Sequence, residues 1–206
     1  MGRYLGSVCK LCRREGAKLV LKGRRCTTKC PIDKKSKKPG QHGANMRIKL
    51  SEYAVRLREK QKAKRIAYLN ENQFYHYFLK ATAMKGLAGL NLIKLLSMRL
   101  DNVVYLMGLA PSRMAARQLI THGHFQVNDK RSTLPGRIVA VGDKIKIAAG
   151  MADNQHIPAI QGEVSSPGWL SYDKNSKTGS VVAEPSKEQT PYAGVNEQFI
   201  VELYSK

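Results

Sequence analysis

The fold is decided by the stretch that runs from residue 91 to residue 147, NLIKLLSMRLDNVVYLMGLAPSRMAARQLITHGHFQVNDKRSTLPGRIVAVGDKIKI. In its first part, residues 91–107, leucine, valine and methionine recur at intervals of three and four residues, which is typical of one amphipathic helix closed by Gly108. A second, shorter helix begins near Ser112, a favoured N-cap residue, and turns Leu119 and Ile120 inward. Two packed helices therefore open the stretch.

After these helices the apolar residues alternate, which is typical of strands. Phe125 and Val127 precede an Asn128-Asp129 turn, Pro135-Gly136 marks another turn, and Gly142-Asp143 leads into a last alternating run. The sequence therefore predicts an α+β fold in which two helices lead into a small, hairpin-rich sheet.

Upstream of this stretch, a helix is predicted from Glu52 to about Leu69, with Ser51 as its N-cap. Cations spaced four residues apart form one stripe on it: Arg56, Lys60 and Lys64. A solvated helix usually pairs such cations with acids of its own, and here Glu59 is the acid available. We therefore expect the stripe to face phosphates.

Positive charge is concentrated at the start of the chain. Residues 1–65 hold 21 Lys and Arg against 4 acids, whereas residues 66–206 hold 15 against 11. Crowded cations repel one another unless a polyanion lies between them, so nucleic acid is the expected partner. The sequence has no apolar run of about 18 residues and no apolar segment typical of a secretion signal, which predicts a soluble, cytoplasmic protein.

Four cysteines lie in this basic part, Cys9 and Cys12 followed by Cys26 and Cys30. The spacing C-x2-C, thirteen residues, C-x3-C is close to that of tetrahedral, structural zinc sites. An iron-sulfur cluster could use the same ligands, and two disulfides or four unrelated thiols are the alternatives without a metal. A metal would fix a segment too short and too charged to build its own core.

A lysine-rich segment, DKKSKKPGQHG at residues 33–43, follows the cysteines and is expected to be an extended strap on phosphates, with a solvated linker as the alternative. The basic pattern gives these RNA-contact candidates besides the helical stripe: Arg3, Arg13, Arg14, Arg24, Arg25, Lys34, Lys35, Lys37, Lys38, Gln41, His42, Arg47 and Lys49.

The run RLDNVVY at residues 99–105, with Ser112-Arg113, ARQLI at 116–120, His122-Gly123 and VNDK at 127–130, resembles a small RNA-binding module. This module is named after small ribosomal subunit protein four and also occurs in pseudouridine synthases, some tyrosyl-tRNA synthetases and a heat-shock protein. The resemblance implies an RNA face made by Arg99, Arg113, Arg117, Gln118, His122, Asn128 and Lys130. For Arg99, a salt bridge to Asp101 is an equal alternative.

The rest of the chain resembles the bacterial, four-cysteine variety of that ribosomal protein family, through MGRY at residues 1–4, the cysteine pairs, PGQHG at 39–43 and NEQFIVELYSK at 196–206. The resemblance implies a structural protein of the small subunit that binds 16S rRNA first, nucleates assembly of its 5′ domain and contributes to translational accuracy. It also implies contacts with small-subunit protein five and, in some bacteria, with the protein's own mRNA.

The same resemblance implies the domain organisation. A basic, metal-clamped extension occupies residues 1–45, a mainly helical rRNA-binding domain occupies 46–90 and is completed by 165–206, and the two-helix and hairpin module, 91–164, is inserted into it. Trp169-Leu170 and FIVELY at 199–204 are too short to fold alone, so we expect both to pack on the helices before Asn91.

Two other functional classes were weighed against this interpretation. An enzyme is disfavoured, because the sequence has no Gly-rich phosphate loop, no HExxH-type metal site and no nucleophile with a spaced base. A stand-alone RNA-modifying enzyme would also need a catalytic domain for which too little chain remains. A zinc-dependent DNA-binding regulator remains the alternative, although no base-reading helix or dimer interface is visible. No membrane and no small-molecule substrate is expected.

Overall fold

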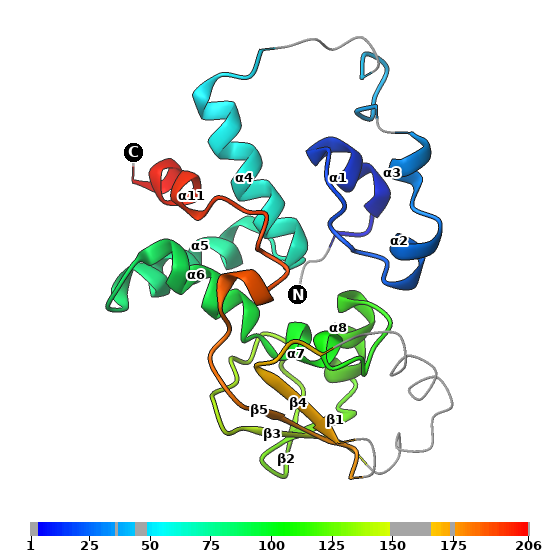
Figure 1. Cartoon of the computed structure of the whole chain (residues 1–206), viewed down its shortest axis with the longest axis vertical. Helices are drawn as coiled ribbons and strands as arrows, with labels where there is room; N and C mark the ends of the chain where they lie inside the picture. Colours follow the sequence, from blue (N-terminus) through cyan, green and yellow to red (C-terminus); the bar gives the residue numbers. More distant parts are fainter. Residues whose placement is uncertain (1–3, 36, 44–48, 149–165, 174–175, 206) are drawn as a thin grey trace. The chain divides into compact units, whose positions relative to one another are not determined.

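The computed structural model describes residues 4–35, 37–43, 49–148, 166–173 and 176–205, without the side chain of Arg24 (Figure 1). The helices are α1 (Val8–Glu15), α2 (Arg24–Thr28), α3 (Pro31–Lys34), α4 (Glu52–Ile66), α5 (Glu71–Ala83), α6 (Ala88–Ser97), α7 (Leu100–Leu106), α8 (Arg113–Thr121), the 3-10 helix η1 (Lys187–Gln189) and α11 (Glu197–Tyr204). The strands are β1 (Phe125–Val127), β2 (Lys130–Ser132), β3 (Lys144–Ile147), β4 (Leu170–Asp173) and β5 (Thr178–Val181). The mixed helix and strand content agrees with the predicted α+β class. Among the described residues no helix is long and apolar enough to cross a membrane.

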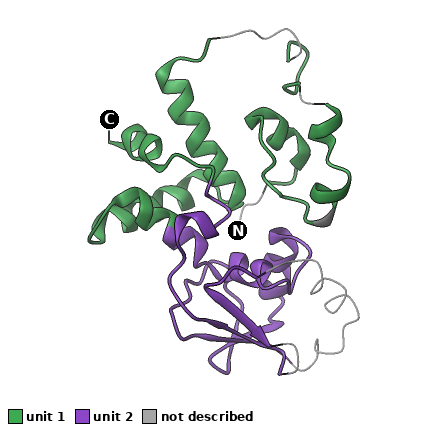
Figure 2. Cartoon of the chain, in the orientation of Figure 1, with its two compact units in different colours: residues 1–93, 194–206 green, residues 94–193 purple. Residues whose placement is uncertain are grey.

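The chain forms two compact units (Figure 2). Unit 1 contains residues 1–93 and 194–206, and unit 2 contains residues 94–193. We predicted that everything from residue 165 onward completes the helical part, but β4 and β5 extend the sheet of unit 2. Trp169 is buried in the core of that unit. The prediction that it packs on the helices before Asn91 was therefore wrong, because an open strand edge takes up a nearby apolar segment as a further strand.

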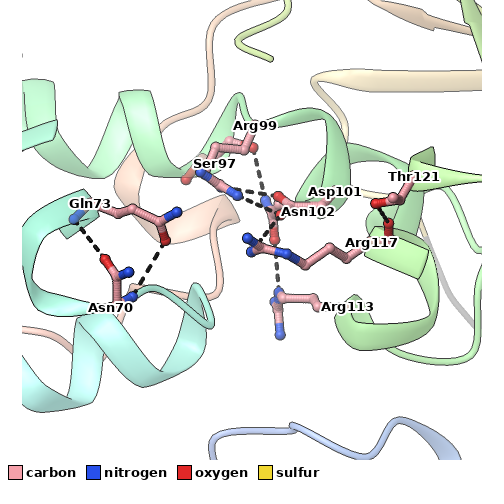
Figure 3. Close-up of polar contacts among 9 residues, drawn as sticks. All are labelled: Asn70, Gln73, Ser97, Arg99, Asp101, Asn102, Arg113, Arg117 and Thr121. Atoms are coloured by element: carbon pink, nitrogen blue, oxygen red, sulfur yellow. Dashed lines mark hydrogen bonds and ion pairs between the residues drawn. The ribbon is translucent and has the colours of Figure 1, made fainter. Parts of the chain in front are cut away.

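In unit 1, α11 packs along α4, although the two helices are far apart in the sequence. The side chain of Ser51 accepts a hydrogen bond from the N–H of Ala54, as expected of an N-cap, and α4 ends at Ile66, slightly earlier than predicted. Helix α5 begins with a capping box, in which Asn70 and Gln73 each bond the other's backbone N–H (Figure 3). Local sequence signals therefore set the start of both helices.

The single helix predicted for residues 91–107 was wrong, because the structure contains two. Helix α6 ends at Ser97, Arg99 is extended, and α7 begins at Leu100. The backbone between them bonds a distant segment, since the N–H of Leu100 donates to the carbonyl of Arg137 over 2.8 Å and the N–H of Val139 donates to that of Met98 over 2.9 Å. These tertiary bonds replace the helical bonds that the break removes.

Unit 2 contains a five-stranded antiparallel sheet in the order β2-β1-β3-β5-β4. Helices α7 and α8 pack against each other, and their apolar residues share one core with the sheet. Leu100, Val103, Ile120, Phe125 and Ile145 are completely buried there. The helix and strand periodicities in the sequence therefore point into the same core.

The predicted turn between β1 and β2 is confirmed. Asn128 and Asp129 both have positive φ, 52° and 62°, which is the geometry of the tight hairpin turn that matches strand twist. The Asn128 side chain accepts the N–H of Lys144 and donates to Asp143, so it ties the turn to β3.

Candidate nucleic-acid interface

The four cysteines lie at the start of unit 1 on three short helices. Cys9 and Cys12 lie on α1, Cys26 lies on α2, and Cys30 caps α3. Cys12 and Cys30 are buried, and all four are free thiols. The disulfide alternative therefore finds no support in the described residues.

The thiols lie near one another and near backbone donors. Burial raises the pKa of Cys12, a hydrogen bond from the backbone of Leu19 opposes this, and the charges of Cys26, Cys30 and Cys9 raise it further. The N–H of Lys22 donates to the sulfur of Cys26 over 3.2 Å. As the side chains stand, however, no three His, Cys, Asp or Glu residues in the described part of the chain form a group that could hold a metal ion.

The lysine-rich segment after α3 is not the extended strap that we predicted. The N–H of Gly43 donates to the carbonyl of Gly40, which has a φ of 111°, so the chain turns here. Arg13 donates from Nε to the carbonyl of Lys37 and thereby holds the segment against α1. The turn still leaves basic and polar side chains exposed: Lys34, Lys35, Lys37, Gln41 and His42, with Lys38 half-buried.

Several remaining candidates in the basic part are also accessible, namely Arg14, Arg25 and Lys49. Arg3, Arg47 and the side chain of Arg24 lie outside the described residues. Contact between this whole group and RNA stays a prediction.

The cations of the α4 stripe form ion pairs with acids. Arg56 pairs with Glu52 and Glu202, while Lys60 and Lys64 share Glu71. Beside the stripe, Arg58 and Arg65 share Glu15, and Lys62 pairs with Glu59. The premise that Glu59 alone is available was therefore wrong, because the fold brings acids from α1, α5 and α11 to this helix.

Glu71 is a centre of this network. Its partial burial raises its pKa, but hydrogen bonds from Lys60, Lys64 and Tyr204 outweigh that effect and lower the pKa to about 2. Burial and the hydrogen bond to Glu71 raise the pKa of Tyr204. Glu71 therefore stays ionised while it holds two lysines and the last helix together.

In unit 2 the start of α7 forms a buried polar network with α8 (Figure 3). Arg99 donates from Nε to one oxygen of Asp101 over 3.0 Å and from a terminal nitrogen to the other over 2.5 Å. The second oxygen also lies 3.7 Å from a terminal nitrogen of Arg117. Arg99 is 3% exposed, so the salt-bridge alternative describes it and an RNA contact does not.

Arg113 is likewise turned inward. Its Nε donates to Asn102 over 2.9 Å, and its guanidinium lies 4.5 Å from the centre of the Tyr105 ring. Asn102 in turn donates to the carbonyl of Ser97. Because Arg113 is 6% exposed, its predicted phosphate contact is replaced by a structural role that joins α7 to α8.

The accessible members of the predicted module face are Gln118 and His122 at the end of α8 and Asn128 and Lys130 on the hairpin. The structure adds Arg131, which sequence reasoning missed. It is exposed, donates to the carbonyl of His122 over 3.1 Å and lies so close to Gly123 that a Cβ there would overlap its guanidinium. This contact joins the hairpin to the end of α8, and no neighbouring residue in the sequence signals it.

Comparisons with known proteins agree with this arrangement. Residues 3–97 match the family described as ribosomal protein S4/S9 N-terminal domain, and residues 98–145 match the S4 domain family. Proteins named small ribosomal subunit protein uS4 are similar over their full length and that of this chain. Identity is 51% over 210 residues for Endomicrobium trichonymphae, 51% over 213 for Acetivibrio thermocellus and 50% over 208 for Clostridium beijerinckii.

The two matched segments meet between residues 97 and 98, at the break between α6 and α7. The basic, cysteine-bearing part and the module with its hairpin therefore fall within two successive family matches of this one chain. With about half of all residues identical from end to end, the chain belongs to the family of small ribosomal subunit protein uS4.

Proposed function

We propose that this protein is a structural, non-catalytic component of the small ribosomal subunit that binds its 16S rRNA. The full-length identity to proteins named small ribosomal subunit protein uS4 carries the proposal. The charge of the chain supports it, since a net charge of +21 suits a phosphate-rich partner.

We assign the RNA binding to two groups of exposed side chains. The first is the exposed basic group around α1 to α3, with Arg14, Arg25, Lys34, Lys35 and Lys37. The second is the hairpin face of unit 2, with Gln118, His122, Asn128, Lys130 and Arg131. Folded RNA is recognised mainly through its shape, phosphates and 2′-hydroxyls, and these side chains supply matching donors.

The finer features implied by the family resemblance belong to the same proposal. The protein binds early to the 5′ domain of the rRNA in the cytoplasm, contributes to accurate translation, lies beside small-subunit protein five and, in some bacteria, binds its own mRNA. Each of these follows from the resemblance and not from a contact within this chain.

We propose that the sulfurs of Cys9, Cys12, Cys26 and Cys30 are the four ligands of a zinc ion. Their spacing, the burial of Cys12 and Cys30, and the N–H donors of Lys22 and Leu19 near two sulfurs fit a tetrathiolate site, because such donors stabilise thiolate charge. A bound zinc ion would fix α1, α2 and α3 relative to one another. The sulfurs have to approach one another further to complete the site.

Metal analysis of freshly purified protein, together with an absorption spectrum, tests which metal is bound. Zinc equimolar with the chain and no visible absorption is the expected result, whereas visible absorption with bound iron would favour the cluster. Cys26→Ser should reduce the bound metal, while Ser171→Ala, an exposed position on β4 of unit 2, provides a control that retains it.

Competition binding tests the main proposal. The full chain is titrated with a 16S rRNA fragment that contains the 5′ domain, in the presence of duplex DNA and at several salt concentrations. We expect a strong preference for the rRNA. Equal affinity for both nucleic acids would instead support the DNA-binding alternative.

A further inference from the structure

Unit 1 contains a half-open cavity of about 510 Å³ between the first residues of the described chain and the end of α4. Its lining includes Tyr4, Leu11, Gln61, Lys64 and Tyr68. Cavities of roughly 300–1,000 Å³ hold small organic groups, and this one combines aromatic rings, aliphatic carbon and an amide. It has the size and composition to take up a planar, polar ring.

Tyr68 is held in an uncommon backbone conformation at this cavity. Its φ is 52°, in the left-handed region that large side chains rarely adopt. Its hydroxyl donates to the carbonyl of Leu21 over 2.9 Å, so the far end of the ring is anchored on the cysteine-bearing segment. Such strain persists where the surrounding structure fixes it, and it is enriched at ligand-binding sites.

Tyr4 offers a second, accessible ring. Its side chain is 44% exposed, and it folds over Gly6 so closely that a Cβ on that glycine would lie 2.6 Å from the tyrosine hydroxyl. The glycine therefore gives the ring the space that it occupies beside the cavity.

The cavity wall keeps an excess of positive charge despite its ion pairs. Lys64 shares Glu71 with Lys60, and Arg65 shares Glu15 with Arg58, so each acid is divided between two cations. The side chains of Lys64 and Arg65 remain 17% and 18% exposed. A group that enters here with a phosphate attached would meet surplus cations at the rim.

We propose that this cavity binds one unpaired nucleobase of the RNA, extruded from its helix. The base stacks on the rings of Tyr4 and Tyr68, its edge bonds the amide of Gln61, and its phosphate lies near Lys64 and Arg65. RNA is read mainly at unpaired bases, which stack on aromatic side chains and expose their edges to amides. This inference rests on the proposed rRNA binding and names a subsite within it.

The test uses the full chain with the 16S rRNA fragment. The variants are Tyr4→Ala, Tyr4→Phe and Gln61→Leu, with Tyr53→Ala as the control, because Tyr53 is 62% exposed on α4 and does not line the cavity. We expect Tyr4→Ala to weaken binding about fivefold to tenfold, as loss of one stacked base does, and Tyr4→Phe to retain it. In the wild-type complex, one base should be protected from dimethyl sulfate or, if that base is a uridine, from a carbodiimide reagent. Tyr4→Ala and Gln61→Leu should both restore the reactivity of this base.

The outcomes distinguish the nucleobase subsite from rRNA binding as a whole. If the wild type binds the rRNA but Tyr4→Ala and Gln61→Leu keep its affinity and its modification pattern, the subsite is overturned and rRNA binding stands. An equal loss of affinity in Tyr53→Ala would also overturn the subsite, because the effect would then be general. A wild-type chain that does not bind the rRNA overturns the proposed function itself.

Discussion

The hydroxyl of Tyr204 donates a hydrogen bond to a carboxylate oxygen of Glu71 over 2.8 Å. This bond joins α11 to the start of α5, across most of the chain in sequence. The ring of Tyr204 lies 4.5 Å from that of Phe78 and 4.9 Å from the ammonium nitrogen of Lys60, which also pairs with Glu71. One tyrosine thereby secures α11 within unit 1 through a hydrogen bond, an aromatic contact and a cation–π contact.

Glu71→Gln should make unit 1 less stable at neutral pH. The folded pKa of about 2 lies below the usual value of 4.5, so the charged carboxylate stabilises the fold above about pH 4.5 and this contribution is lost as the pH falls toward 2. Because the side chain is 44% exposed and screened by solvent, we discount the full shift to roughly 1–2 kcal/mol. Urea unfolding followed by circular dichroism, at pH 7 and at stepwise lower pH, measures it.

The difference in the free energy of unfolding between Glu71→Gln and the wild type should narrow as the pH approaches 3. Tyr204→Phe provides a partial control, since it removes the hydroxyl and keeps the ring. A gap that is constant with pH would show that the charge of Glu71 does not contribute to folding.

Asp101→Asn should strongly destabilise unit 2. It leaves Arg99 buried without its charged partner, and breaking a buried ion pair in this way costs about 3–5 kcal/mol. Trp169 is the one tryptophan of the chain and is buried in the core of unit 2, so its fluorescence during denaturation reports this unit directly. The control is Asp129→Asn, which removes an exposed ion pair with Lys146. The denaturation midpoint of this variant should barely change.

Arg113→Met and Lys130→Ala should separate structure from RNA binding. The first removes a buried hydrogen bond to Asn102 and a cation–π contact, so it should cost roughly 1–3 kcal/mol of stability and leave the salt dependence of rRNA binding unchanged. The second should leave stability unchanged and reduce the slope of log affinity against log salt by about one. A reduced slope for Arg113→Met in folded protein would contradict the buried placement of this arginine.

Asp129→Gly should stabilise unit 2 slightly. Asp129 has a φ of 62°, which glycine adopts without steric cost, and the ion pair that it forms with Lys146 is exposed. A small rise in the thermal midpoint is expected, measured by Trp169 fluorescence. A clear fall would indicate that the Lys146 contact outweighs the relief of backbone strain.

Features that depend on neighbours in the sequence could be predicted from it. Ser51 and Ser112 begin α4 and α8 as expected, and Asn128-Asp129 forms the hairpin turn, because caps and tight turns are satisfied by groups a few residues away. The apolar periodicity also selected Ile120 and Phe125 for the core.

The candidate site was predicted less completely, because exposure depends on distant partners. Arg99 and Arg113 have the residue type of phosphate ligands, yet Asp101 and Asn102 hold them in the core. Arg131 was overlooked because nothing next to it in the sequence reveals that β2 brings it to the carbonyl of His122.

The sequence by itself determined the basic character of the chain, its cysteine pairs, the ends of several helices and the family to which it belongs. The tertiary structure alone decided that Glu15, Glu71 and Glu202 neutralise the cations of α4 and that Arg137 and Val139 break the helix after Ser97. It also assigned Trp169 to unit 2. The physical reason is that a charge, a backbone hydrogen bond or a strand edge is satisfied by whichever group the fold brings within a few ångströms, wherever that group lies in the sequence.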